Sequence, residues 1–102
     1  MRVELRDEAR EDLADGAWFY DTQKAGLGDY FVDCVATDIA SLESTFGVHE
    51  KAFGFYRKLV DRFPFAIYYL VSESYVDVIA VLDCRRNPYE IEQRLGRTKG
   101  CS

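Results

Sequence analysis

The stretch that decides the fold is residues 63–82, FPFAIYYLVSESYVDVIAVL. Its first part, up to Val71, is rich in aromatic and β-branched side chains and predicts a strand, in which Pro64 is tolerated because it lies at the start. Ser72–Ser74 is a polar turn, and Tyr75–Leu82 predicts a second strand. Both strands of this hairpin are apolar on two faces. The sheet therefore needs a cover on each side, and the second cover must come from the chain's own C-terminus or from a partner.

Two amphipathic helices are predicted before this hairpin. The first runs from Asp7 to about Lys24 and the second ends at Gly47, a residue that suits a C-terminal cap. Because the link Ala25–Gly28 is short, the two helices form an antiparallel helical hairpin. The core face of the first helix is assigned to Ala9, Leu13, Ala14, Ala17, Trp18 and Tyr20, and its solvent face to Arg10, Glu11, Asp12, Asp15 and Asp21. The core face of the second is assigned to Phe31, Val35, Ile39, Leu42 and Phe46.

Shorter elements complete the expected fold. Val3–Leu5 alternates apolar and polar residues and predicts a first strand, and the aromatic run Ala52–Val60 predicts one further strand. Asn87–Pro88 is typical of a helix N-terminus, so Tyr89–Leu95 is expected to be a short last helix that ends at Gly96.

Size and composition agree with one compact domain. The chain has 102 residues, of which 48% are hydrophobic and 15% aromatic. We expect a single α+β domain over residues 1–102, in which residues 97–102 form a flexible tail. In this domain an N-terminal strand and an α-helical hairpin are packed on a mainly antiparallel four-stranded sheet, and a short C-terminal helix follows. No apolar run reaches the ~18–20 residues that span a bilayer, and the start has no signal-peptide pattern, so a cytoplasmic protein is expected.

Charge is distributed unevenly along the chain. The formal net charge is −5, which divides into −8 for residues 1–50 and +3 for residues 51–102. The acidic total argues against broad nucleic-acid binding, because neutralising phosphates needs a positive face. A local basic patch in the second half is compatible with these numbers.

The cysteines and the histidine indicate neither a metal nor a cofactor. Cys34, Cys84 and Cys101 are too far apart for a disulfide framework or a metal knuckle, so reduced thiols are expected. His49 is the single histidine and leaves zinc without a ligand set.

Basic residues are concentrated around the last strands. They could converge at one edge of the sheet, beside several tyrosines, and would then combine guanidinium donors with stacking surfaces. Such a surface suits phosphates or the carboxylates of a partner protein, whereas the simpler interpretation is that the same charges balance the acidic helices. The residues concerned are Arg57, Lys58, Arg62, Arg85, Arg86, Arg94 and Arg97.

Four motifs occur in a fixed order: WFYDTQKAGLG at residues 18–28, RFPFAIYY at 62–69, VDVIAVL at 76–82 and RRNP at 85–88. This ordered set resembles the RelE/ParE superfamily of bacterial toxin components. The first motif is similar to the helical hairpin of the ParE-like branch, and the whole match covers roughly residues 3–95.

The resemblance implies a small toxin of a type II toxin–antitoxin pair, whose exposed surface is covered by a cognate antitoxin. The RelE branch cuts mRNA on the ribosome, whereas the ParE branch poisons DNA gyrase. The matches that the chain retains are expected to gather on one exposed surface and, with Arg85 and Tyr89, to bind the target or the antitoxin. These retained matches are Arg57, Arg62, Arg86 and Arg94.

Three positions depart from the nuclease pattern. Ala66 stands where the nuclease branch has an arginine, Asp83 where many relatives have a histidine, and Ile91 where an aromatic residue is common. The favoured interpretation is therefore a ParE-like toxin that binds a protein target such as gyrase. Two alternatives stay open. One is a non-toxic relative that serves as an antitoxin-binding or self-associating module, for example a homodimer. The other is a ribosome-dependent mRNA endoribonuclease that uses Arg57, Lys58, Arg86 and Tyr89.

Overall fold

A computed structural model describes the main chain of residues 1–100 and the side chains of residues 1–96. Within this part of the chain, no helix combines the length and the apolar character needed to cross a membrane. The elements are, in chain order, β1 (Arg2–Leu5), α1 (Asp7–Gln23), α2 (Leu27–Thr45), β2 (Lys51–Ala52), β3 (Phe55–Leu59), β4 (Phe65–Val71), β5 (Tyr75–Asp83) and α3 (Pro88–Gly100).

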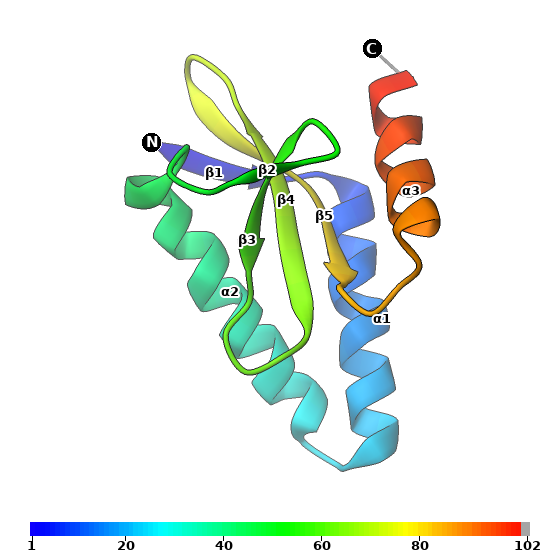
Figure 1. Cartoon of the computed structure of the whole chain (residues 1–102). Helices are drawn as coiled ribbons and strands as arrows, with labels where there is room; N and C mark the ends of the chain where they lie inside the picture. The colour runs from blue at the N-terminus through cyan, green and yellow to red at the C-terminus, as the bar shows by residue number, and fades with distance from the viewer. Residues whose placement is uncertain (101–102) are drawn as a thin grey trace.

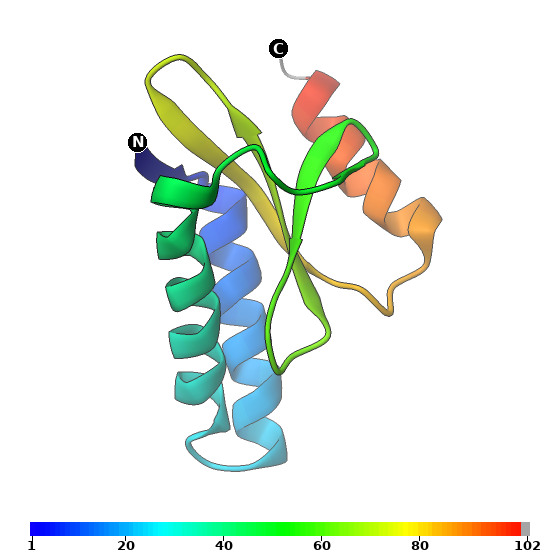
Figure 2. The same cartoon turned by 60° about the vertical axis from the view of Figure 1, so that its left-hand side comes forward.

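The sheet lies between two helical layers (Figures 1 and 2). Its strand order is β1-β5-β4-β3-β2, with β1 parallel to β5 and the other neighbours antiparallel. The hairpin of α1 and α2 covers one face and projects beyond the sheet where the two helices join, whereas α3 lies on the other side (Figure 2). The predicted α+β class and the helical hairpin are confirmed.

The sheet has five strands and not the expected four, because the run predicted as one strand over residues 52–60 folds back on itself. Phe53 and Gly54 both have a positive φ, 58° and 85°. Two left-handed residues in succession are what a two-residue hairpin turn requires. The turn places Ala52 of β2 opposite Phe55 of β3. A glycine inside an aromatic run was the available signal for this turn.

The two long helices approach closely where they join. Gly26 precedes α2 with a φ of 87°, and a Cβ on Gly28 would overlap the carbonyl oxygen of Ala17 in α1. The Gly28 amide donates to the Asp21 carboxylate at 2.8 Å. Beyond this junction, both helices pack on the first face of the sheet in one core cluster, whose buried members include Ala9, Phe31, Val35, Ile39, Leu42, Phe65, Ile67, Tyr69, Val76, Val78 and Val81.

The predicted faces of α1 need correction at three positions. Trp18, expected in the core, is 72% exposed, and Ala14 is exposed as well. Trp18 follows the buried Gly16 by two residues, which is about 200° around a helix, so it points away from the core. Asp12, expected in solvent, is buried. Its position follows from hydrogen-bonding partners that periodicity does not reveal.

A bulge in β5 supplies one of these partners. The pairing of β4 with β5 shifts by one residue, which makes Ile79 an extra residue in β5 and reverses the alternation beyond it. The N–H of Val81 then points away from β4, to the outer edge of β5. No strand pairs with this part of the edge, because β1 ends at Leu5, opposite Val78. The carboxylate of Asp12 accepts this N–H at 3.0 Å. A side chain of α1 thus closes the open edge of β5.

The second face of the sheet is covered by the chain's own α3. Ile91 and Leu95, 5% and 1% exposed, belong to a second apolar cluster. The predicted N-terminus of this helix is confirmed, since the Asn87 side chain accepts the N–H of Tyr89 at 2.8 Å. The predicted end at Gly96 is wrong, because the helix continues to Gly100. The sheet residues of this cluster are Phe55, Ala66, Tyr68, Ile79, Ala80 and Leu82.

The flexible tail expected over residues 97–102 stays a prediction, and residues 101 and 102, which include Cys101, lie outside the described residues.

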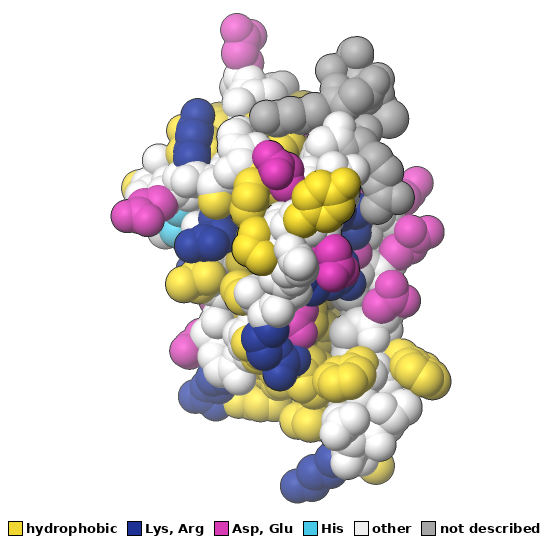
Figure 3. All heavy atoms as spheres, turned by 45° about the vertical axis from the view of Figure 1, so that its right-hand side comes forward, with side chains coloured by type: hydrophobic (Ala, Val, Ile, Leu, Met, Phe, Trp, Pro, Cys, Tyr) yellow, Lys and Arg dark blue, Asp and Glu magenta, His cyan; other side chains and the backbone are white. Residues whose placement is uncertain are grey.

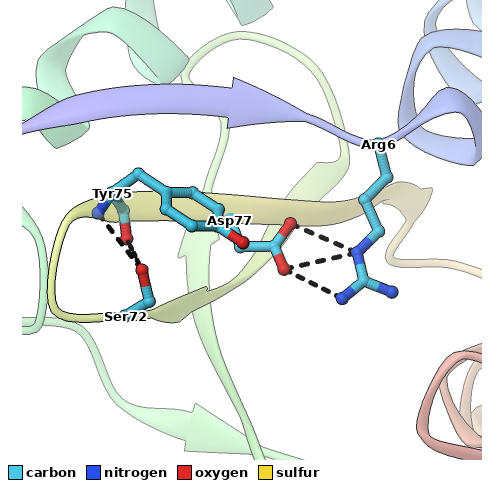
Figure 4. Close-up of polar contacts among 4 residues, drawn as sticks. All are labelled: Arg6, Ser72, Tyr75 and Asp77. Atoms are coloured by element: carbon cyan, nitrogen blue, oxygen red, sulfur yellow. Dashed lines mark hydrogen bonds and ion pairs between the residues drawn. The ribbon is translucent and has the colours of Figure 1, made fainter. Parts of the chain in front are cut away.

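Polar contacts fix the end of the sheet near β1 (Figure 4). The Arg6 guanidinium contacts both carboxylate oxygens of Asp77 at 2.9–3.3 Å and so ties the start of α1 to β5. In the predicted turn, the Ser72 N–H donates to the carbonyl oxygen of Tyr75 at 2.9 Å. The contacts among these four residues stabilise the fold, and we do not assign them to the functional surface.

Candidate partner-binding surface

A hollow of about 230 Å³ lies between α1 and the end of β5. It has an apolar wall and a charged rim, and its size suits one side chain of a partner better than a large cofactor. Figure 3 shows hydrophobic side chains exposed toward the end of the molecule where the helical hairpin projects, with basic side chains beside them. The wall is formed by Gly16, Phe19, Phe65 and Val81, and the rim by Asp12, Asp15, Asp83 and Arg86.

Two of the three rim carboxylates are already bound within the chain. Asp83 accepts hydrogen bonds from the Arg85 guanidinium at 2.7 and 3.0 Å, and this contact holds the pKa of Asp83 below its ordinary value. Asp12 accepts two hydrogen bonds from the guanidinium of Arg94 in α3. Asp15 and Arg86 form no ion pair within the described residues. The hollow therefore offers a partner one carboxylate and one guanidinium beside an apolar wall.

Large aromatic side chains are exposed next to this hollow. Phe19 in its wall is 46% exposed, and the preceding Trp18 is the more exposed of the two. Exposed aromatics beside an arginine are the residue types enriched at the energetic centres of protein interfaces. We define the α1–β5 surface as Asp15, Trp18, Phe19, Phe65 and Arg86.

The four arginines expected on one exposed surface do not share one, so that prediction is wrong. Arg94 is directed into the molecule, where its side chain is 15% exposed and forms two hydrogen bonds with Asp12 at 2.6 and 2.8 Å. Arg62 lies in the loop between β3 and β4, and its guanidinium donates to the hydroxyl of Tyr30 in α2. Of the four, only Arg86 lines the hollow.

Arg57 and Lys58 lie next to each other on β3, and neighbouring side chains of a strand point to opposite faces. Arg57 is paired across the sheet with Tyr68, whose pKa is raised by burial and lowered less strongly by Arg57. Lys58 is on the other face and lowers the pKa of His49 by charge repulsion, in addition to the larger effect of burial. The two cations therefore do not converge on one reacting atom.

His49 has a structural partner. Its Nδ1 lies 2.5 Å from the hydroxyl of Tyr69, which also accepts the N–H of Gly47 at 3.1 Å. Burial lowers the pKa of His49 and so favours the neutral imidazole, whose Nδ1 can accept the hydroxyl proton of Tyr69. Among the described residues, no three histidine, cysteine, aspartate or glutamate side chains are grouped so as to hold a metal ion.

No family model matches the sequence, and no curated protein matches it. A chain of the solved structure described as "Chromosomal ParDE TA system from P. aeruginosa" superposes with a TM-score of 0.72 at 15% sequence identity, and the match covers 79% of this chain and 92% of that chain. The chain has a RelE/ParE-like fold. The architecture that the sequence motifs implied is thereby confirmed.

Within this RelE/ParE-like fold, the residues at the three positions that depart from the nuclease pattern are engaged in core packing or in an ion pair. Ala66 is fully buried and Ile91 is 5% exposed, and both belong to the cluster that packs α3 on the sheet. Asp83 is held by Arg85. Tyr89, which could replace a missing acid or base, is 66% exposed at the start of α3. None of the first three residues presents a free acid or base.

Sequence reasoning missed the apolar part of the α1–β5 surface of this RelE/ParE-like fold. Phe19 falls outside the core period of α1, and its adjacent Trp18 falls on the side opposite the core. Two consecutive aromatics off the core face were the signal that could have indicated a binding surface. Phe65 and Arg86 were singled out, but their contact with α1 depends on tertiary packing.

Proposed function

We propose that the chain is a ParE-like toxin of a bacterial type II toxin–antitoxin system. It acts in the cytoplasm by binding a protein target, for which DNA gyrase is the favoured candidate. A cognate antitoxin neutralises it. The fold similarity supports the toxin class. The observation that carries the mode of action is the α1–β5 surface, an apolar hollow with exposed aromatics and the unpaired Arg86.

The physical chemistry of this surface favours a protein over a nucleic acid. Its rim carries Asp15 as well as Arg86, and a net charge of −5 repels phosphates at long range. An arginine beside exposed aromatics instead suits a partner that supplies a carboxylate and an apolar side chain.

The positions of the candidate catalytic residues weigh against the ribonuclease alternative. Phosphodiester cleavage needs an acid or base together with cations that converge on one phosphate. Arg57 and Lys58 lie on opposite faces of β3, and the position of Ala66 is closed by α3. A non-toxic binding module remains as the alternative without activity, and it is distinguished by experiment.

The test is induction of the chain in bacterial cells, with and without the product of the neighbouring open reading frame. We expect growth arrest with DNA damage, relieved by co-expression. Arrest without DNA damage, accompanied by primer-extension products of cleavage on ribosome-bound mRNA, would favour the ribonuclease. Absence of arrest at every expression level would leave the non-toxic module.

A further inference from the structure

The turn that follows β5 carries two consecutive arginines whose charges are used differently. Arg85 and Arg86 are both exposed. Arg85 is paired with Asp83, whereas Arg86 forms no ion pair within the part of the chain that the structure describes. The turn holds all three residues together, because the N–H of Arg86 donates to the carbonyl oxygen of Asp83 at 3.1 Å.

Both carboxylate oxygens of Asp83 are occupied by the first of these arginines. Oδ1 accepts the main-chain N–H of Arg85 at 2.8 Å and its Nε at 3.0 Å, and Oδ2 accepts from Nη2 at 2.7 Å. A two-bond contact of this kind fixes the orientation of the guanidinium and the carboxylate. Burial raises the pKa of Tyr20 in α1, and the charges of Arg85 and Asp83 act on it in opposite directions, so the pair lies close to this helix.

Arg86 is a second cation within reach of the same carboxylate. The hydrogen bonds from Arg85 lower the pKa of Asp83 most strongly, and the charge of Arg86 lowers it further. Arg86 and Asp83 also line the same hollow. Without Arg85, Asp83 would attract Arg86 into an ion pair and would repel any carboxylate that a partner brings to the hollow.

We propose that Arg85 is a positioning residue of the α1–β5 surface: by occupying Asp83, it keeps Arg86 free to bind an aspartate or glutamate side chain of the target protein. This inference rests on the proposed function, since it assigns the anchoring contact of the same surface. Arg85 acts through its neighbours and does not itself contact the target. The identity of the residue that holds Asp83 therefore sets the affinity of the toxin.

The first experiment measures the toxicity of the full chain in bacterial cells. Inducer is titrated, and the amount of chain that halves the growth rate is determined by immunoblot. Arg85→Ala should raise this amount about twofold to sixfold, because an exposed ion pair between Asp83 and Arg86 would leave only a fraction of the molecules able to bind. Arg85→Lys keeps a cation beside Asp83 and should recover most of the toxicity.

A double-mutant cycle separates positioning from direct contact. Asp83→Asn removes the charge that would capture Arg86 and keeps the size of the side chain. In this background, Arg85→Ala should leave the required amount of chain nearly unchanged. The matched control is Arg2→Ala, which breaks the pair with Glu4. That pair has the same spacing in the chain and an arginine side chain that is 64% exposed, against 63% for Arg85, and its loss should not alter toxicity.

The second experiment does not depend on toxicity. NMR titration of the purified chain gives the pKa of Asp83. In Arg85→Ala, Arg86 should take over the carboxylate and keep this pKa below its ordinary value of 3.8. In Arg85→Ala/Arg86→Ala the turn has no arginine, and the pKa should be higher than in the single variant. Equal values in the two variants would show that Arg86 is not drawn to Asp83, and the proposal would be overturned.

The toxicity measurements separate failure of this proposal from failure of the proposed function. If the wild-type chain arrests growth and Arg86→Glu relieves the arrest, but Arg85→Ala is as toxic as the wild type, the positioning role is wrong and the toxin function stands. An equal loss on removing Arg85 with and without the Asp83 charge also overturns the positioning role, since Arg85 would then contact the target itself. If the wild-type chain arrests no growth, the toxin assignment fails and the positioning role fails with it.

Discussion

Asp12 and Arg94, 82 residues apart in the chain, form a two-bond ion pair that joins α1 to α3, and the same carboxylate accepts the N–H of Val81. One side chain therefore holds together both helical layers and the sheet. It also helps to hold α3 in place on the second face of the sheet.

Removing this carboxylate should destabilise the protein strongly. Asp12→Ala leaves a guanidinium that is 15% exposed without its partner and a strand N–H without an acceptor. Breaking a buried ion pair by removing one member costs about 3–5 kcal/mol, which urea unfolding would measure. Arg2→Ala breaks the pair with Glu4, whose side chains are 64% and 49% exposed, and should change stability by less than about 1 kcal/mol. Equal effects of the two substitutions would contradict the role given to Asp12.

Two glycine-to-alanine substitutions should have opposite signs. At Gly28 the new methyl group would overlap main-chain atoms of Ala17 and force the helices apart, so the free energy of unfolding should fall. At Gly96, within α3, no described atom other than the neighbouring residues and the adjacent helix backbone lies within 4 Å of the new Cβ, and stability should rise by up to about 1 kcal/mol. Thermal unfolding of both variants checks the pair. A stabilising Gly28→Ala would be incompatible with the observed helix junction.

Stability should decline as the solution becomes mildly acidic, partly through His49. In the folded chain, burial lowers the pKa of His49 below its ordinary value of 6.5. The unfolded chain then binds more protons below about pH 6.5, so stability that is present above this pH is lost as the pH falls through the lowered pKa. His49→Gln can still accept the Tyr69 hydroxyl proton but does not titrate. Urea unfolding between pH 5 and 8 should show a shallower decline for this variant, and parallel curves would refute the assignment.

Substitutions on the α1–β5 surface should reduce toxicity without unfolding the protein. Phe19→Ala and Arg86→Glu change exposed residues, so their effect on stability should stay near 0.5 kcal/mol, about the limit for surface positions. Colony counts after induction should recover on the order of tenfold, because truncating a central interface residue costs about 2 kcal/mol. Arg10→Glu, on the solvent side of α1, is the matched control and should remain as toxic as the wild type. Full toxicity of Arg86→Glu would exclude this surface.

Restoring the arginine of the nuclease branch should not create a ribonuclease. Ala66 is fully buried beneath α3, and Ala66→Arg would place a charge among Leu82, Ile91 and Leu95. Burial of an unpaired charge is among the costliest changes in a core. We expect a lower unfolding temperature and no cleavage of ribosome-bound mRNA by primer extension. Cleavage by this variant would show that the fold needs only that one cation for catalysis.

The fold could be predicted from the sequence wherever local patterns decide structure. Ser72–Ser74 provided the turn, the period of Phe31 to Phe46 provided α2, and Asn87 provided the start of α3. The prediction failed where tertiary contacts override the pattern. Asp12 is buried because Arg94 and a bulge in β5 give it partners, and neither can be read from the period of α1.

The candidate site was harder to predict because charge alone does not reveal pairing. Arg62 and Arg94 were expected to be free, yet each has an intramolecular partner, Tyr30 and Asp12 respectively. Arg86 stays unpaired because its near neighbour Asp83 is occupied by Arg85. The pair of Asp83 with Arg85 is local, but the partners of Arg62 and Arg94 lie 32 and 82 residues away in the chain, and no spacing in the sequence encodes such contacts.

The short β1 strand has a consequence for handling the protein. Beyond Leu5, the edge of β5 is covered by the side chain of Asp12 from α1 and not by another strand. Proteolysis in the segment before Pro88 would remove Arg94, the ion-pair partner of Asp12, and would expose Ala66 and Leu82. We expect fragments of this kind to aggregate, because an open strand edge beside exposed apolar side chains is a template for pairing with another chain.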